Sequence, residues 1–113
     1  MEFNDLEYHA VKKEVAVFIE SIRPPAHVRN ELDIVFTIDD QTIEIGEQRP
    51  VWRGEPGEVS VLTSAKITYV RTKKAWNLYW MRTDMKWHLY ESVKNLADAL
   101  KIVEEDANGC FFG

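Results

Sequence analysis

The sequence predicts an α+β fold: a five-stranded, mainly antiparallel sheet in the order α-β-β-β-β-β-α, with the N- and C-terminal helices packed on one face. Two observations lead to this prediction. Each end of the chain has apolar residues at helical spacing, and between them five short runs resemble strands separated by turn residues. The chain has 113 residues, 45% of them hydrophobic. This is enough for one core, so residues 1–113 are predicted to form a single domain.

The first helix is predicted over residues 4–22. Asn4 is a favourable N-cap, and Glu7 stands three positions later, where a capping box places its acid. The apolar residues recur at spacings of four, three and four, which gives one helical stripe: Val11, Val15, Phe18 and Ile22. Pro24 and Pro25 end the helix, because proline lacks the amide donor and restricts the residue before it.

The first two strands are predicted over residues 32–39 and 42–49. The first alternates, and its inner face is Leu32, Ile34, Phe36 and Ile38. In the second, Ile43 and Ile45 point inward, and Pro50 ends the strand or places it at an edge. Residues 53–60 then form the longest loop, which we expect to be the most mobile segment. Trp52 opens this loop, either as a lid or partner anchor or as a cover for the end of the sheet.

Three further strands are predicted over residues 65–72, 76–82 and 85–91, with Lys73 and Lys74 in the first turn between them. Asn95 caps a last helix, which Asn108-Gly109 ends and whose inner stripe is Leu96, Ala99, Leu100 and Val103. Because the connections between strands are short, the strands should form an antiparallel meander. The sheet face away from the helices should carry charged residues together with Val35, Val70, Tyr79 and Met81.

The composition favours a cytoplasmic protein. Cys110 is the only cysteine, so no disulfide forms within the chain, which is typical of a reducing compartment. The first residues lack the pattern of a signal peptide. No stretch approaches the roughly 18 apolar residues of a membrane span, so we expect no membrane partner.

A basic, aromatic hairpin is the most suggestive functional feature. The formal net charge is −5, yet residues 47–86 contain eight Lys/Arg against four Asp/Glu. Cations bind phosphates, and aromatic rings stack on the bases of single-stranded nucleic acid. We therefore predict a non-enzymatic binding module for an anionic partner, single-stranded nucleic acid being one candidate, held by Arg71, Lys73, Lys74, Trp76, Trp80 and Arg82. The competing interpretation is structural: the aromatic residues belong to the core and the lysines solvate a turn.

The sequence leaves two other functions open. One is a protein-interaction or homodimer module that uses the sheet face away from the helices. The other, least favoured, is a metal-dependent hydrolase or nuclease whose candidate residues are Glu44, Glu47, Lys66 and His88. The chain contains no Glu-x-Lys motif of the kind that metal-dependent nucleases use, so catalysis is the weaker hypothesis.

No motif predicts a metal or cofactor. The three histidines lie far apart, and neither a zinc-ligand spacing nor a Gly-rich phosphate loop is present. Cys110 stands between glycine and phenylalanine, which favours a packing role over that of a nucleophile. Phe111 and Phe112 should dock the C-terminal segment onto the domain, since two exposed phenylalanines would otherwise form an aggregation or partner site.

Several segments together resemble the bacterial family known as domain of unknown function 3024 (DUF3024). They cover nearly the whole chain: Arg23-Pro24-Pro25, residues 44–49 with Pro50 and Trp52, Ala65-Lys66, Tyr69-Val70-Arg71, Trp76, Tyr79-Trp80-Met81-Arg82, Lys86-Trp87-His88 and residues 109–113. The resemblance implies a small, single-domain bacterial protein. It carries over no activity, ligand or catalytic residue.

Overall fold

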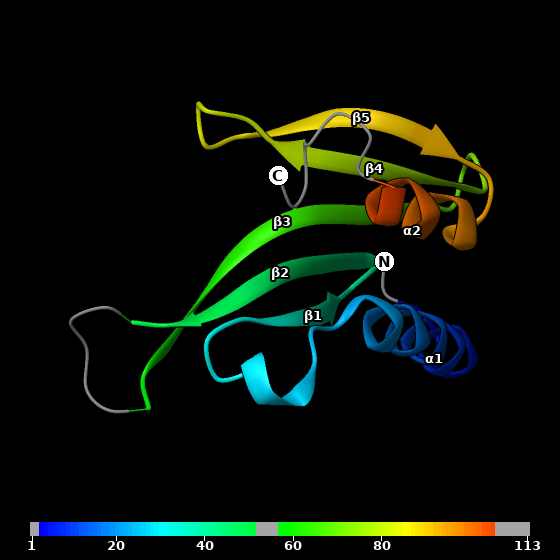
Figure 1. The fold of residues 1–113 in the computed structure, drawn as a ribbon. Coiled ribbons are helices and arrows are strands. Elements are labelled where there is room, and N and C mark those ends of the chain that lie inside the picture. Colours follow the sequence, from blue (N-terminus) through cyan, green and yellow to red (C-terminus); the bar gives the residue numbers. More distant parts are fainter. Residues whose placement is uncertain (1–2, 52–56, 106–113) are drawn as a thin grey trace.

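The computed structural model of the protein describes residues 3–51 and 57–105, and it confirms the predicted α+β fold (Figure 1). Five antiparallel strands form one sheet in the order β1-β2-β3-β4-β5, so each strand lies beside its neighbours in the sequence. The two helices pack on one face of this sheet. The elements are α1 (Asp5–Ile22), the 3-10 helix η1 (Ala26–Val28), β1 (Asp33–Asp39), β2 (Thr42–Pro50), β3 (Val59–Val70), β4 (Ala75–Met81), β5 (Trp87–Val93) and α2 (Leu96–Glu105).

The N-terminus of α1 is held by the predicted capping box. The side-chain oxygen of Asn4 accepts a hydrogen bond from the Glu7 amide at 2.8 Å, and the Glu7 carboxylate accepts one from the Asn4 amide at 2.9 Å. Both bonds satisfy donors that the first turn of a helix leaves without a partner. The helix ends at Ile22, immediately before Arg23 and the two prolines, as predicted.

The core lies between the helices and the inner face of the sheet. Ile43, Ile67 and Leu78 are fully buried and stand side by side across β2, β3 and β4. Burial of one such side chain contributes about 1.5–3 kcal/mol. The helices cover this row with Val11, Val15, Phe18 and Ile19 from α1 and with Leu96, Ala99, Leu100 and Val103 from α2. The stripe of α2 is the predicted one, whereas in α1 Ile19 joins the buried set and Ile22 is only half-buried.

A bidentate ion pair ties the end of α1 to the start of β1. Arg23 donates hydrogen bonds to both carboxylate oxygens of Asp33, at 2.7 and 2.8 Å, and Asp33 is only 8% exposed. These bonds, together with one from the Ile34 amide, lower the pKa of Asp33. A charge-assisted bidentate pair fixes both distance and orientation, so it sets where α1 lies on the sheet.

The bounds predicted for the third and fifth strands were wrong. β3 begins at Val59, not at residue 65, so residues 59 and 60 belong to a strand and not to the predicted loop. It also ends at Val70. β5 spans Trp87–Val93, and Met85 lies instead in the β4–β5 turn with a φ of 63°. The predicted roles of Trp52, of the loop residues 53–56 and of residues 108–113 lie outside the described residues.

Two irregularities in the register interrupt the sheet. One lies between Ile45 and Gly46 where β2 meets β3, and the other between Leu78 and Tyr79 where β4 meets β5. At the first, the chains come so close that a Cβ on Gly46 would stand 2.7 Å from the Leu62 carbonyl oxygen and 2.9 Å from a methyl group of Val61. Glycine is therefore required at this position by close backbone approach.

We expect Gly46→Ala to lower the free energy of unfolding by about 1–3 kcal/mol, because the new methyl group must push the β3 backbone away. Urea denaturation followed by circular dichroism measures this change. Thr37→Ala, which truncates an exposed side chain of β1, is the control and should change stability by less than about 0.5 kcal/mol. Equal stability of wild type and Gly46→Ala would refute the close approach.

Candidate binding surface

The two faces of the sheet differ in what covers them. Leu78 on β4 is fully buried beneath the helices, so the alternation of the strand turns Asn77 and Tyr79 to the opposite side. Among the described residues no helix covers that side (Figure 1). We call it the open face. Tyr79 and Met81 lie on it, as the sequence predicted.

A lysine held between two aromatic rings occupies the open face. Lys66 on β3 stands directly opposite Tyr79 on β4, and its ammonium nitrogen lies 5.0 Å from the centre of the Tyr79 ring. The same nitrogen lies 5.3 Å from the Trp87 ring on β5. Both distances are in the range of cation–π attraction. We refer to Lys66, Tyr79 and Trp87 as the Lys66 cluster.

Among the side chains that the structure describes, the open face of β4 and β5 carries no acidic residue. Its members, given by the alternation and the register, are Asn77, Tyr79 and Met81 from β4 and Trp87, Leu89 and Ser92 from β5. The nearest carboxylate in the register is Glu44 on β2, which pairs with Lys66 from the other side. Beside Lys66 on the same face, the hydroxyls of Thr42 and Thr68 form a 3.1 Å hydrogen bond.

Trp76 and Trp80, which the sequence assigned to the binding site, lie on the helix side. Both alternate in phase with Leu78 and pack against the core. The Trp76 ring contacts Tyr69, at 4.8 Å between ring centres, and Trp80 meets Tyr90 edge-on at 6.5 Å. They therefore face away from the Lys66 cluster, although they stand on the same strand as Tyr79.

Arg71 is engaged in an ion pair with the first helix. Its guanidinium donates to both carboxylate oxygens of Glu7, at 2.6 and 3.1 Å, and lies 5.9 Å from the Tyr69 ring. The hydrogen bonds from Arg71 and from the Asn4 amide lower the pKa of Glu7. The pair joins the β3–β4 hairpin to the N-terminus of α1, and its two charges largely cancel.

The other predicted cations lie at the two ends of β4. Lys73 and Lys74 are exposed in the β3–β4 turn, where Lys74 has a φ of 47°. Arg82 follows the opposite end of β4, with its guanidinium 5.4 Å from the Trp80 ring. The structure thus brings Arg71, Lys73 and Lys74 near one another and Arg82 beside Trp80, but it does not gather all six residues into one site.

The four hydrolase candidates are divided between the two faces. Glu44 and Lys66 lie on the open face, whereas Glu47 stands opposite the buried Ile34, and His88 opposite Trp80. His88 instead pairs with Asp84 at 2.9 Å, and this contact lowers the pKa of Asp84. Within residues 3–51 and 57–105, no group of three or more His, Cys, Asp or Glu side chains is placed to hold a metal ion.

Local sequence patterns indicate only part of the Lys66 cluster. They place Tyr79 on the open face but not Trp87. At the register irregularity between Leu78 and Tyr79, β5 has one extra residue, Tyr90, and this changes which residues of β5 face outward. A strand that gains one residue reverses its alternation beyond that point. Only the register with β4 shows that Trp87 and Tyr79 share a face.

One family matches this chain. Its sequence model, described as a domain of unknown function (DUF3024), matches residues 3–113. The chain belongs to the DUF3024 family. The resemblance found in the sequence is thereby confirmed over essentially the whole length of the chain. Comparisons with curated proteins and with solved structures found no match. No described helix of this DUF3024 chain is long and apolar enough to cross a membrane.

The Glu7–Arg71 pair predicts a pH-dependent contribution to stability. The pKa of Glu7 is lowered on folding. The stability that its carboxylate contributes to the folded protein is therefore fully present above pH 4.5, the ordinary pKa, and is lost as the pH falls through the lowered pKa. Glu7→Gln should therefore be less stable than wild type at neutral pH, and this difference should shrink in acid. Urea unfolding between pH 7 and pH 3 measures it.

The matched control is Glu14→Gln, which removes an exposed carboxylate from the same helix. Its stability relative to wild type should stay constant over this pH range. A difference between Glu7→Gln and wild type that does not change with pH would show that the ion pair adds no stability.

Proposed function

We propose that this DUF3024 chain is a single-domain, non-enzymatic binding module that holds an anionic partner, single-stranded nucleic acid, on its open sheet face. The observation that carries the proposal is the Lys66 cluster, in which two aromatic rings flank a cation on a surface that no described helix covers. Sheets of this kind bind single strands by stacking bases on aromatic side chains while cations contact the backbone.

The Lys66 charge stays available to a phosphate. Aromatic rings attract the ammonium group but carry no net charge, so they orient the side chain without neutralising it. None of the described side chains on the open face of β4 and β5 is acidic, so no carboxylate on these two strands offsets the Lys66 charge. Glu44, on the other side of Lys66, limits the site to the β4 and β5 side of that residue.

Further cations stand at both ends of the same two strands. Lys73 and Lys74 lie in the turn before β4, and Lys86 lies immediately before Trp87 on β5. β4 has seven residues and is therefore about 23 Å long, at roughly 3.3 Å per residue. A single strand that follows β4 would meet cations at its start, near its middle and at its end.

The non-enzymatic part of the proposal is supported by the separation of the hydrolase candidates. Glu44 and Glu47 occupy opposite faces of β2, so they cannot share one metal ion without a rearrangement of the strand. The single cysteine of the sequence supports the proposal that the partner is met in the cytoplasm.

The test is the affinity of the protein for a fluorescently labelled single-stranded DNA or RNA oligonucleotide, followed by anisotropy across a salt series. Binding should weaken with salt, with a log–log slope near −0.7 for each phosphate contacted. Trp87→Leu should weaken it about 5- to 150-fold, because stacking on one ring contributes about 1–3 kcal/mol.

Trp80→Leu is the matched control, since Trp80 lies on the helix side of the same sheet. It should leave the affinity of the folded protein within about twofold of wild type. Absence of binding at low salt would overturn the proposal. Equal losses for Trp80→Leu and Trp87→Leu would show that the open face is not the site.

A double charge reversal, Lys73→Glu with Lys74→Glu, tests whether the hairpin turn extends this site. We expect weaker binding and a salt slope that is less steep by up to about 0.7 for each phosphate that the variant no longer binds. The comparison is Lys66→Gln, which removes the central charge. If only Lys66→Gln weakens binding, the turn lies outside the site. If only the double reversal does, the turn is the site and the Lys66 cluster is structural.

A further inference from the structure

β3 has twelve residues and is longer than β4, the seven-residue strand that pairs with it on the side away from β2. Its residues 65–70 pair with β4, but its residues 59–63 pair only with β2. Figure 1 shows the β2–β3 hairpin running out beyond β4 and away from the β4–β5 hairpin. Within the described chain, the outer part of β3 is therefore a free edge.

The backbone groups of this edge can be assigned. The Val51 amide donates to the Glu58 carbonyl at 3.0 Å, so the groups of Glu58 point toward β2. Successive residues of a strand point their amide and carbonyl groups to opposite sides. The backbone groups of Val59, Val61 and Thr63 therefore point outward, on the side where β4 would continue.

Three of the five side chains along the free edge are apolar and exposed, and the other two are the hydroxyl residues Ser60 and Thr63. Val59 is 50% exposed, Val61 51% and Leu62 62%. No charged residue occurs between Glu58 and Lys66. Natural proteins protect free edges with charges, prolines or covering elements, and residues 59–65 contain no charge or proline. An edge of this kind is a site for the addition of another strand.

We propose that the occupant is a second copy of this chain, whose residues 59–63 pair antiparallel with the same residues of the first. The proposal is independent of nucleic-acid binding. In the register centred on Val61, this residue faces its own copy, Val59 faces Thr63, and Ser60 faces Leu62. All outward amide and carbonyl groups of the three edge residues then find partners in both copies.

Self-pairing fits the charge pattern of the segment. When a strand pairs with the same strand of a second copy, each charged side chain comes to lie opposite or close to its own like charge. Residues 59–63 contain no charged side chain, so this repulsion does not arise. The same patch serves both copies, as a twofold interface requires. At each end, Glu58 of the second copy approaches the end of β4, where the exposed Arg82 follows Met81.

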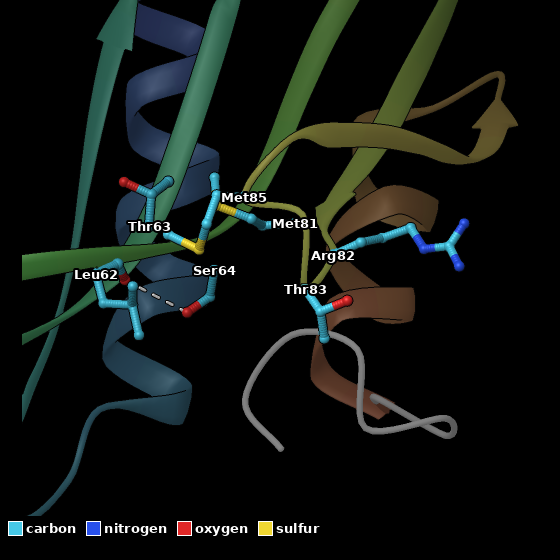
Figure 2. Close-up of a pocket in the computed structure, with 7 residues that line it drawn as sticks. All are labelled: Leu62, Thr63, Ser64, Met81, Arg82, Thr83 and Met85. Atoms are coloured by element: carbon cyan, nitrogen blue, oxygen red, sulfur yellow. Dashed lines mark hydrogen bonds between the residues drawn. The ribbon is translucent and has the colours of Figure 1, made fainter.

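A hollow marks the place where the second strand would begin. It has a volume of about 260 Å³ and lies between β3 and the end of β4. Figure 2 shows Met81 and Met85 close to Thr63 and opposite Leu62, with the Arg82 side chain pointing away. Methionine side chains adapt to irregular neighbours, so the hollow suits an incoming valine of the second copy.

The test is the oligomeric state of the whole chain by sedimentation velocity, from micromolar to several hundred micromolar protein. Wild type should dimerise. Val61→Lys and Val61→Glu should each weaken the dimer about tenfold or more, because each places like charges directly opposite one another. An equimolar mixture of the two variants should regain the dimer, since lysine then faces glutamate.

The control is Val17→Lys, which adds the same charge at an exposed apolar position of α1 and should leave the dimer unchanged. A wild type that stays monomeric throughout the range overturns the proposal. So does undiminished dimerisation of both Val61 variants, which would place the interface elsewhere. A mixture that remains monomeric while each variant is monomeric would show that Val61 does not face its own copy.

Discussion

The covering of one sheet face by both helices is the constraint on which the rest of this structure depends. It divides the side chains of every strand into an inner and an outer set, because neighbours alternate. Ion pairs at both ends of α1 then fix its place: Glu7 binds Arg71 of the β3–β4 hairpin, and Arg23 binds the nearly buried Asp33 of β1. Both pairs are bidentate, which restricts rotation as well as distance.

This division sorts the aromatic residues of β4 into two sets. Trp76 and Trp80 alternate with Leu78 toward the helices and enlarge the core, while Tyr79 turns outward beside Lys66. A sequence window that is rich in aromatic and basic residues thus contains two populations with different surroundings. Counting both populations as one group assigns too many residues to the proposed site and leaves out Trp87, whose ring lies beside Lys66 from the next strand.

Most of the fold follows from local patterns, and the exceptions have physical causes. The apolar stripe of α2 and the alternation of β1 indicate which side chains form the core, and the capping box indicates where α1 begins. The outer half of β3 escaped prediction because Val59, Val61 and Leu62 are all exposed, so no buried face imposes an alternation there. The register irregularities depend on the partner strand, as Gly46 shows against Leu62, and a single strand does not reveal them.

The free edge and the open face belong to the same strand, and their geometry links the two proposals. Residues that face each other in an antiparallel pair project their side chains to the same side of the sheet. Pairing about Val61 would therefore leave the open faces of both copies on one side, as one continuous surface with two Lys66 clusters. A single strand long enough to reach both clusters would bind the second at a high effective concentration. Self-association would then raise the affinity for long single strands more than for short ones, without any new contact.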